Sequence, residues 1–379
     1  MAQANTSKSH VVVGMSGGVD SSVAAHLLLE AGYQVTGLFM KNWEEDDGTE
    51  YCTAIADLED AQRACDTLGI ELQTANFAAE YWDNVFADFL EDYQANRTPN
   101  PDVLCNREIK FKQFARYANL LGGDFIATGH YARITHKAGT PRLLKAADSN
   151  KDQTYFLQAV ASSQLANVLF PLGDWQKSEV RKRARQLGLA NHNRKDSTGI
   201  CFIGERRFAD FLTRYITDSP GPMVDELGVT VGEHRGLHQY TLGQRQGLGI
   251  GGLAGRNEAA WYVVAKQADN NTLVVSQSAQ LLQGSWLLAD QANWLEKVEL
   301  PLTCQAKIRY RQADQSCRVW PVSAHRYLVE FMQPQRAITP GQHIAFYQDD
   351  ILLGGATIQS TAQPRAHRIT RANRKSKVQ

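Results

Sequence analysis

The stretch "VVVGMSGGVDSSVAAHLL", residues 11–28, decides the fold of the first half of the chain. An apolar run breaks into Ser-Gly-Gly-Val-Asp-Ser-Ser and then resumes with helical spacing. This pattern predicts a buried strand, a glycine-rich turn, and a helix whose first turn carries hydroxyl groups. Glycine permits close backbone approach and positive φ, and a helix N-terminus presents amide donors. The turn is therefore expected to hold an anion, with phosphate as the expected ligand.

The turn is not one of the common nucleotide-binding motifs. The lysine of G-x-x-x-x-G-K-[ST] is missing, and the spacing does not match G-x-G-x-x-G. An acidic residue, Asp20, lies within the loop instead, which suggests a metal ion that bridges to the phosphates.

Composition indicates an ordinary globular protein. The chain has 379 residues, is 43% hydrophobic and has a formal net charge of zero, so its length suggests two or three domains. No apolar run approaches the roughly 18 residues of a membrane span. The opening "MAQANTSKSH" lacks the apolar core of a secretory signal. We therefore expect no membrane partner and a cytoplasmic location.

The order of the predicted elements indicates an α/β fold. Strand-like runs at 11–13, 35–40, 70–74 and 125–128 alternate with helical patterns at 53–68, 81–95 and 109–121. Such alternation predicts a parallel sheet covered on both faces. A glycine-rich region follows, and after it come short β-rich runs typical of a small antiparallel barrel or sandwich. The expected domains are 1–218 (catalytic), 219–284 (small central linking domain), 285–362 (C-terminal antiparallel β-barrel) and 363–379 (a basic, disordered tail).

Three charged segments each allow two interpretations. The tail after residue 351 has no acidic residue and is rich in arginine, so it is either a solvated end or a nucleic-acid contact. In "CQAKIRYR", strand alternation puts Lys307, Arg309 and Arg311 on one face, which is either solvated or a basic stripe that contacts nucleic acid. The acidic "KNWEEDDG", residues 41–48, either binds metal or is a solvated loop, and the second is favoured because adjacent carboxylates seldom form a cage.

Two of the six cysteines are candidates for chemistry. No C-x-x-C pair suggests a zinc or thioredoxin-like site. Cys105 and Cys201 lie in "NRTPNPDVLCNREIKF" and "DSTGICFIGERRF", turn-rich settings where a thiolate is expected to be partly exposed. The helix predicted after Cys105 would lower the pKa of its thiol, and Asp102 is close enough in sequence to handle a proton. The other four cysteines are interpreted as inert.

The motifs together resemble one family. "SGGVDSS" resembles the PP-loop of N-type ATP pyrophosphatases, and it is followed in order by "TPNPDVLCN", "TGHYAR", "KDQTYFL" and "DSTGICFIG". From residue 11 to about 359 the chain resembles the bacterial tRNA-specific 2-thiouridylases. That family replaces the C2 oxygen of the wobble uridine, position 34, by sulfur in the tRNAs for lysine, glutamate and glutamine. The resemblance implies a PP-loop ATP pyrophosphatase domain with an adenine nucleotide alpha hydrolase-like fold for residues 1–218, and tRNA contact by the central domain, residues 219–284.

The resemblance also implies a mechanism and a set of site residues. ATP, expected with Mg²⁺, would adenylate the C2 oxygen; Cys201 would carry a persulfide from a sulfur-relay donor protein, and Cys105 would act as nucleophile and close a disulfide with Cys201. Asp102 matches the acid/base position. The residues matched to nucleotide binding are Gly14, Met15, Ser16, Gly17, Gly18, Val19, Asp20, Ser21, Met40 and Gly129. Those matched to tRNA contact are Asn100, Pro101, Asp102, His130, Lys151, Asp152, Gln153, Arg309, Tyr310 and Gln342. No metal ligand is assigned.

Rival hypotheses remain at this stage. GMP, NAD and argininosuccinate synthetases share the PP-loop, but they use nitrogen nucleophiles and need no paired cysteines. A sulfur-transferring enzyme with an iron–sulfur cluster would need clustered cysteines, which this sequence lacks. A non-catalytic RNA-binding protein would tolerate replacement of both Cys105 and Cys201.

Overall fold

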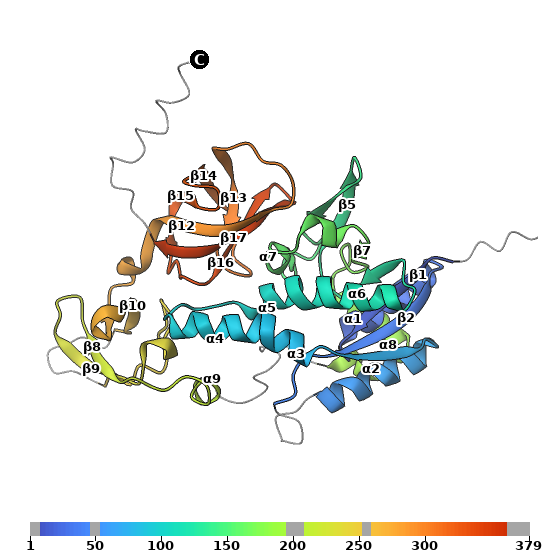
Figure 1. The fold of residues 1–379 in the computed structure, drawn as a ribbon, viewed down its shortest axis with the longest axis horizontal. Coiled ribbons are helices and arrows are strands. Elements are labelled where there is room, and N and C mark those ends of the chain that lie inside the picture. Colours follow the sequence, from blue (N-terminus) through green and yellow to red (C-terminus); the bar gives the residue numbers. More distant parts are fainter. Residues whose placement is uncertain (1–7, 46–53, 195–207, 252–258, 362–379) are drawn as a thin grey trace, which may run out of the picture.

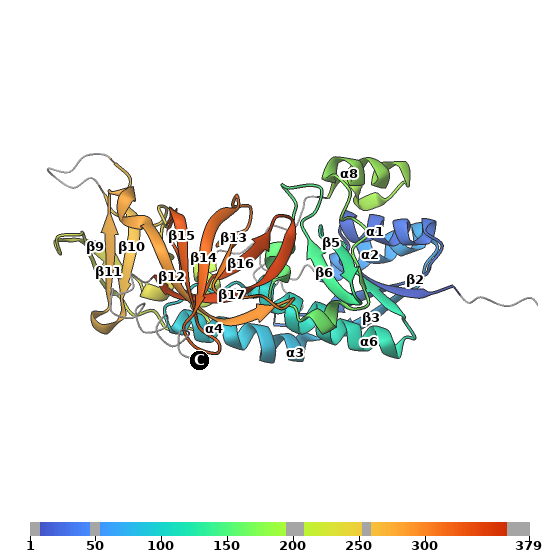
Figure 2. The same cartoon turned by 90° about the horizontal axis from the view of Figure 1, so that it is seen from above.

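The chain folds into three bodies arranged along one long axis. A computed structural model describes residues 8–45, 54–194, 208–251 and 259–361. A parallel-sheet domain lies at one end, a small sheet at the other, and a barrel between them (Figures 1 and 2). The predicted combination of an α/β domain, a small central domain and a C-terminal antiparallel barrel is confirmed.

The first domain is built on a parallel sheet with strand order β3-β2-β1-β4-β7. Its strands are β1 (His10–Met15), β2 (Gln34–Lys41), β3 (Leu72–Asn76), β4 (Phe125–Ala127) and β7 (Val168–Leu169). β3 begins two residues later than its sequence pattern predicted, because Ile70 lies in the turn that caps the preceding helix: its amide donates to Cys65 O at 3.0 Å, after Gly69 at φ +68°.

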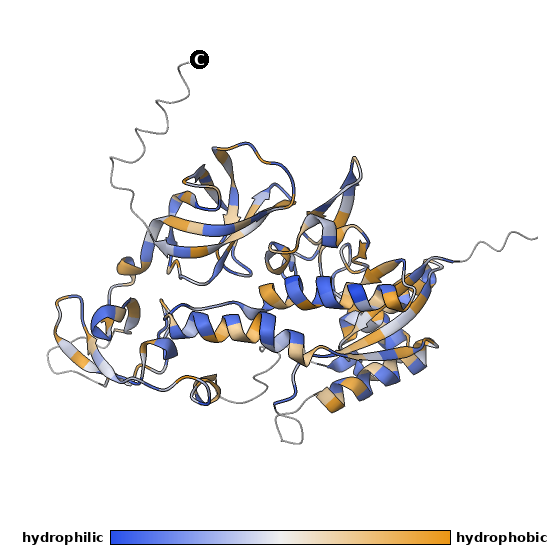
Figure 3. Cartoon of the chain, in the orientation of Figure 1, coloured by the Kyte–Doolittle hydropathy of each residue, from blue (hydrophilic) through white to orange (hydrophobic). Residues whose placement is uncertain are grey.

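Helices cover both faces of this sheet. Successive residues of β1 enter different cores: Val11 and Val13 pack with α1 (Val19–Glu30) and α8 (Lys177–Gln186), whereas Val12 packs with α6 (Phe114–Leu120). Period-two alternation produces this split. Figure 3 shows α6 and α2 (Ala54–Leu68) banded in both colours, as expected for helices with one buried stripe.

The helix that carries Asp102 and Cys105 starts earlier than predicted. A continuous helical run consists of α5 (Pro101–Leu104), the π-helix η2 (Cys105–Gln113) and α6. Proline at the first helical position is favourable because its missing N–H would have no intrahelical partner there. The prediction of a helix from residue 109 was therefore wrong at its start. Cys105 lies inside the helix, not in a turn before it.

The other two bodies are antiparallel or mixed. The central sheet has the order β10-β11-β8-β9, formed by β8 (Gly221–Val224), β9 (Thr230–His234), β10 (Tyr262–Gln267) and β11 (Thr272–Ser276). The barrel runs β12-β15-β14-β13-β16-β17, and pairing of β12 with β17 closes it. Its strands are β12 (Gln283–Trp294), β13 (Leu302–Lys307), β14 (Gln315–Pro321), β15 (Tyr327–Arg336), β16 (His343–Gln348) and β17 (Ile351–Thr361).

A hairpin of the first domain extends the barrel sheet. β5 (Arg133–Lys137) pairs with β6 (Thr140–Leu144), and Leu144 pairs with Ile351 of β17. The first domain and the barrel therefore share one hydrogen-bonded edge. The remaining short elements are α3 (Ala78–Tyr81), η1 (Trp82–Phe86), α4 (Ala87–Gln94), α7 (Thr154–Leu157), η3 (Ser162–Leu165), η4 (Ala190–Asn193), α9 (Phe208–Leu212), η5 (Leu237–Gln239), η6 (Ala268–Asn270) and η7 (Ala279–Leu282).

Within the described residues, no helix is both long enough and apolar enough to cross a membrane.

Phe86 provides a test of the larger core, which is the hydrophobic cluster that contains Val12 and Cys105. Its ring is fully buried and lies within 6 Å, centroid to centroid, of Trp43, Phe89 and Phe211. We expect Phe86→Ala to lower the free energy of unfolding by about 3–5 kcal/mol, because it removes apolar contacts and leaves a cavity. Urea unfolding followed by circular dichroism measures this change. Leu120→Ala is the control, since Leu120 is 84% exposed and its loss should cost less than about 0.5 kcal/mol.

Candidate active site

The glycine-rich turn connects β1 to α1 and leaves amide donors at the helix start. Gly17 adopts φ +73°, and an added Cβ there would overlap the carbonyl oxygen of Asp57. Gly18 is the N-cap and makes no side-chain capping bond. The first amides of α1 therefore lack the capping acceptor that many helices supply, and with the helix dipole they favour an anion. This geometry agrees with the phosphate loop predicted from the sequence.

Hydroxyl groups brace the loop from inside. Ser21 and Ser22 each donate to Gly18 O, at 3.1 and 3.0 Å, and Gly18 N donates to Ser16 Oγ at 3.4 Å. Ser21 and Ser22 are buried, whereas Ser16 is exposed. Two of the three serines thus shape the loop, and Ser16 is the one open to a ligand.

The other residues matched to nucleotide binding gather around the loop. A Cβ on Gly129 would lie 2.8 Å from Ser21 N, so only glycine lets the end of β4 approach α1 this closely. A Cβ on Gly14 would lie 3.4 Å from Met40 Cε. The structure therefore brings Gly14, Met40 and Gly129 to the same edge of the sheet, at the carboxyl ends of its strands, where ligands of parallel sheets bind.

Sequence reasoning missed the residues that hold the loop from outside. Lys177 Nζ lies 2.7 Å from both carboxylate oxygens of Asp20, and Tyr131 OH donates to Asp20 Oδ1 at 2.8 Å. Asn191 Nδ2 donates to Gly17 O at 2.9 Å, and Arg194 contacts the same oxygen. Lys177 and Asn191 follow Asp20 and Gly17 by more than 150 residues, so no sequence spacing could have indicated these contacts.

The described residues do not form a magnesium site of their own. Both oxygens of Asp20 are taken by Lys177, and the described part of the chain contains no group of three or more His, Cys, Asp or Glu side chains able to hold a metal. In this arrangement Asp20 is paired with Lys177, and a metal ligand at Asp20 stays a prediction. Residues 41–45 of the acidic segment are described, with Glu44 close to Lys41 and Asn76, whereas residues 46–48 lie outside the described residues.

Cys105 differs from its prediction in exposure. Its side chain is 2% exposed and belongs to the larger core, so the expected partly exposed setting was wrong. The helical run begins four residues before it, so Cys105 lies within a helix whose buried residues join the hydrophobic core. Cys201 lies outside the described residues.

The Asp102 carboxyl, near Cys105, has a perturbed pKa. Burial raises the pKa of Asp102 above its ordinary value, and the positive charge of Lys110 opposes this shift. A carboxyl with a raised pKa exchanges protons closer to neutral pH. The backbone carbonyl of Asp102 also accepts the Cys105 amide, so the two residues share one helical turn.

His130 is a second residue whose pKa the charge of Lys110 affects. It is buried between Phe111 and Phe170, and its Nδ1 lies 2.7 Å from Thr128 Oγ1. Burial lowers the pKa of His130 well below its ordinary value, and the charge of Lys110 lowers it further. The ring is therefore neutral at pH 7.

The segment before Asp102 is held by both other domains. Gln342 Nε2, from the barrel, donates to Thr98 O at 2.9 Å and to Pro99 O at 3.1 Å. From the central domain, Lys266 Nζ donates to Asn96 O at 3.1 Å. Sequence matching gave Gln342 as a tRNA contact; in this structure it fixes the backbone that leads into Asn100, Pro101 and Asp102.

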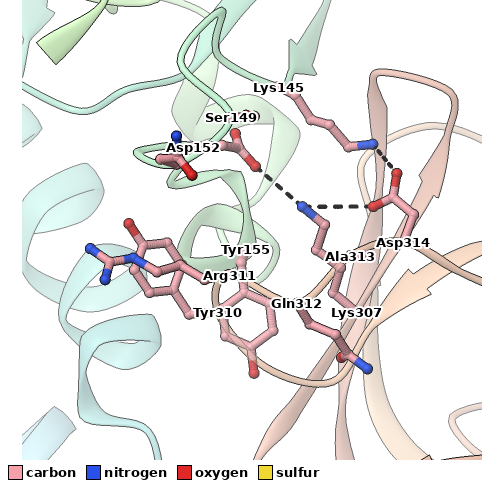
Figure 4. Close-up of a pocket in the computed structure, with 11 residues that line it drawn as sticks. Lys145, Ser149, Asp152, Tyr155, Lys307, Tyr310, Arg311, Gln312, Ala313 and Asp314 are labelled. Carbon is pink, nitrogen blue, oxygen red and sulfur yellow. Dashed lines mark hydrogen bonds and ion pairs between the residues drawn. The ribbon is translucent and has the colours of Figure 1, made fainter.

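A cavity of about 390 Å³ lies where the first domain meets the barrel (Figure 4). Lys145 Nζ is 2.5 Å from Asp314 Oδ2, and Lys307 Nζ lies 3.6 Å from Asp314 Oδ1 and 3.7 Å from Asp152 Oδ2. Both lysines also lie over the Tyr347 ring. Opposite charges from the two domains thus alternate across one wall of the cavity.

The basic stripe is therefore only partly what the sequence predicted. β13 ends at Lys307, and Arg311 has φ +62°, so strand alternation does not continue to Arg311. Lys307 is paired with aspartates, and Arg309 donates to Ala337 O at 2.8 Å. Arg311 is the stripe residue that is exposed.

The residues near the cavity that were predicted to contact tRNA differ in burial and in their internal hydrogen bonds. Asp152 is buried and accepts the hydroxyl of Thr154, and Gln153 Oε1 accepts the amide of Tyr131 at 2.9 Å. Lys151 is half-buried, whereas Tyr310 lines the cavity and packs on Phe156. The structure brings these residues to one junction but engages Asp152 and Gln153 internally.

The remaining described cysteines are interpreted as inert. Cys65 is buried, and burial raises the pKa of its thiol to about 12. Cys304 and Cys317 face one another across β13 and β14 inside the barrel, with Sγ atoms 3.7 Å apart. Thiols held protonated by burial are poor nucleophiles. Cys52 lies outside the described residues.

Comparison with known proteins gives consistent matches along the chain. Residues 9–205 match a family model described as "tRNA methyl transferase HUP domain". Residues 209–277 match "tRNA methyl transferase PRC-barrel domain", and residues 285–358 match "Aminomethyltransferase beta-barrel domain". The three matched ranges coincide with the three bodies of the fold.

Curated relatives are similar over nearly the whole length. The tRNA-specific 2-thiouridylase MnmA of Marinomonas sp. (strain MWYL1) is 58% identical, covering 92% of this chain and 90% of the relative. The proteins of the same name from Pseudomonas fluorescens (strain SBW25) and Serratia proteamaculans (strain 568) are 57% and 56% identical, covering 94% and 95% of this chain and 96% and 99% of theirs. A solved 4-thiouridine synthetase–RNA complex with bound ATP is 16% identical at a TM-score of 0.35, a likeness that covers 54% of this chain and 50% of the other.

Gly17 tests the loop geometry. We expect Gly17→Ala to abolish measurable ATP binding, because its Cβ would collide with Asp57 O and displace the loop. Gly32→Ala is the matched control: Gly32 also has positive φ, at +90°, but no atom lies within 4 Å of its added Cβ. Both variants carry the left-handed backbone strain of about 1–2 kcal/mol, and only the first adds the clash. Equal ATP affinity in the two variants, measured by calorimetry, would contradict the assigned loop geometry.

Proposed function

This chain belongs to the tRNA-specific 2-thiouridylase family, and from that membership we propose that it replaces the wobble-uridine C2 oxygen by sulfur in the tRNAs for lysine, glutamate and glutamine. It is a tRNA-uridine 2-sulfurtransferase, the activity that its relatives' name describes. The observation that carries the finer proposal is that the phosphate loop and the Cys105 helix meet around His130. Gly129 packs on Ser21 of the loop, and the charge of Lys110 acts on both Asp102 and His130.

ATP supplies the activation step in this proposal. The uridine C2 oxygen forms a bond to the α-phosphorus, and the bond from that phosphorus to the bridging oxygen breaks, so pyrophosphate leaves. The C2 oxygen then departs with AMP when sulfur attacks C2. The uncapped amides at the start of α1 and the exposed Ser16 support a phosphate ligand here. Mg²⁺ is proposed only as a companion of ATP, held by phosphate and water oxygens.

Two cysteines balance the sulfur chemistry. Cys201 carries the terminal sulfur as a persulfide, loaded by a donor protein. The thiolate of Cys105 attacks Sγ of Cys201, which releases the terminal sulfur with its electron pair toward C2 and leaves a Cys105–Cys201 disulfide. Asp102 accepts the proton that the Cys105 thiol loses, and its raised pKa suits that task.

tRNA is proposed to bind across the junction of the first domain and the barrel. Asn100, Pro101 and Asp102 would contact the target base, at the start of the helix that leads to Cys105. Arg311 lines the cavity, and the half-buried Lys151 lies in sequence between two lining residues, Asn150 and Asp152; both cations suit a polyanionic partner. The further residues proposed to contact or position tRNA are His130, Asp152, Gln153, Arg309, Tyr310 and Gln342. A cytoplasmic location, where the substrate tRNA would be met, is part of the same proposal.

Family membership decides among the rival enzymes. The synthetases that share the PP-loop act on small molecules, whereas the relatives over nearly the full length are tRNA thiouridylases. A non-catalytic RNA-binding protein is distinguished by the cysteines, because it would not need either one.

The cysteine pair gives the central test. With a persulfide preloaded on Cys201, a single turnover should produce one 2-thiouridine per enzyme and a Cys105–Cys201 disulfide, which mass spectrometry of the tRNA and of the protein would detect. Cys105→Ser and Cys201→Ser should each lose thiolation with the persulfide donor. Cys65→Ser is the matched control for loss of a buried thiol. Full activity of Cys201→Ser would move the sulfur-carrier role to another residue.

Salt dependence tests the tRNA surface. If Arg311 contacts a phosphate, Arg311→Ala should reduce the slope of log affinity against log salt by roughly 0.7–0.9, because one fewer counterion is released. Arg311→Lys keeps the charge and should keep the slope. Filter binding at several salt concentrations measures both variants. An unchanged slope in Arg311→Ala would reassign this side chain to solvent.

A further inference from the structure

Lys177 places a buried positive charge against the phosphate loop. It is 8% exposed, and its Nζ lies 2.7 Å from both oxygens of Asp20, in the first turn of α1. Its own backbone amide donates to Asp148 Oδ2 at 2.9 Å, which anchors the start of α8. The ammonium therefore has a defined position beside the uncapped amides of α1.

Stability alone does not explain this arrangement. A buried ion pair contributes little net stability, because desolvation of both charges offsets their attraction. The pair is also not sealed: the Asp20 side chain is 30% exposed, whereas the Lys177 side chain is 10% exposed. The carboxylate of Asp20 is therefore accessible to solvent, although the pair is partly buried.

Asp20 is positioned as the counter-ion of this lysine. Tyr131 OH donates to Asp20 Oδ1 at 2.8 Å, and Lys177 Nζ lies 5.8 Å from the centroid of the Tyr131 ring. Three contacts thus fix the carboxylate of Asp20 and the ammonium of Lys177 relative to each other. The charge that faces an incoming polyphosphate is then supplied by Lys177 and the α1 amides, with Asp20 holding the lysine in place.

We propose that Lys177 binds the β and γ phosphates of ATP and stabilises the departing pyrophosphate. This inference rests on the proposed use of ATP. Adenosine would lie toward Gly14 of β1 and Met40 of β2, so the phosphates would extend along the loop toward Asp20 and Lys177. When the α-phosphorus bonds to the uridine oxygen, the electron pair of the broken bond passes to pyrophosphate, and the ammonium compensates that charge.

The test compares nucleotides that differ only in these phosphates. Isothermal titration calorimetry of the full chain with ATP, pyrophosphate and AMP, at fixed Mg²⁺, should show that Lys177→Ala loses about 10- to 100-fold in affinity for ATP and pyrophosphate, as expected for a lost charge-assisted contact. AMP affinity should change less than about threefold, because AMP lacks those phosphates. Lys182→Ala is the matched control, since Lys182 is an exposed cation on the same helix.

A second variant separates binding from folding. Lys177→Ala leaves the Asp20 charge uncompensated and could unfold the loop for that reason. The neutral pair Lys177→Met with Asp20→Asn removes both charges and should lose ATP and pyrophosphate affinity to the same degree while keeping AMP.

The outcomes are distinguishable. Equal ATP affinity in the wild type and both Lys177 variants would overturn this inference and leave ATP use intact. Equal losses for ATP and AMP would also overturn it, because they indicate collapse of the loop. A wild-type chain that binds none of the three nucleotides would overturn the proposed use of ATP itself.

Discussion

The uncapped N-terminus of α1 is the constraint on which the rest of the site depends. A helix start without a capping side chain leaves amide donors that need an acceptor, and here Gly18 makes no such cap. The described residues around the loop bind its backbone carbonyl at Gly17 instead. Asn191 and Arg194 hold Gly17 from behind, and Gly129 allows β4 to approach Ser21. These contacts fix a loop conformation in which the first amides of α1 can donate to a ligand.

The second organising feature is the junction of three domains at residues 96–99. The barrel contributes Gln342 and the central domain contributes Lys266, and both bind backbone carbonyls immediately before the Asp102 helix. Backbone carbonyls are strong acceptors, so such bonds fix a segment without depending on its side chains. A tRNA that contacts the barrel would therefore be linked mechanically to the residues proposed to act on the base. The barrel and the central domain therefore also fix the segment that leads into the Asp102 helix.

Charge is used inside the protein more than its sequence suggests. Lys177 belongs to a helix rich in basic residues, yet its ammonium is paired with Asp20. Lys307 looked like part of an exposed stripe, but Asp152 and Asp314 neutralise it across the barrel junction. Counting basic residues along an element therefore overstates the positive surface available to RNA. Only exposure and pairing, which depend on distant segments, separate a phosphate contact from an internal ion pair.

The sequence by itself determined the local elements and the chemistry they offer. Alternation in β1, the glycine turn and the serines that follow it predicted the strand, loop and helix, because these depend on neighbouring residues. It also singled out Asp102 and Cys105, although it misplaced the start of their helix and the exposure of the thiol. Only the tertiary structure decided that Lys177 meets Asp20, that Gln342 holds Thr98, and that Lys307 is paired. Those contacts join residues that are far apart in the chain, and their existence depends on how whole domains pack, which no local spacing encodes.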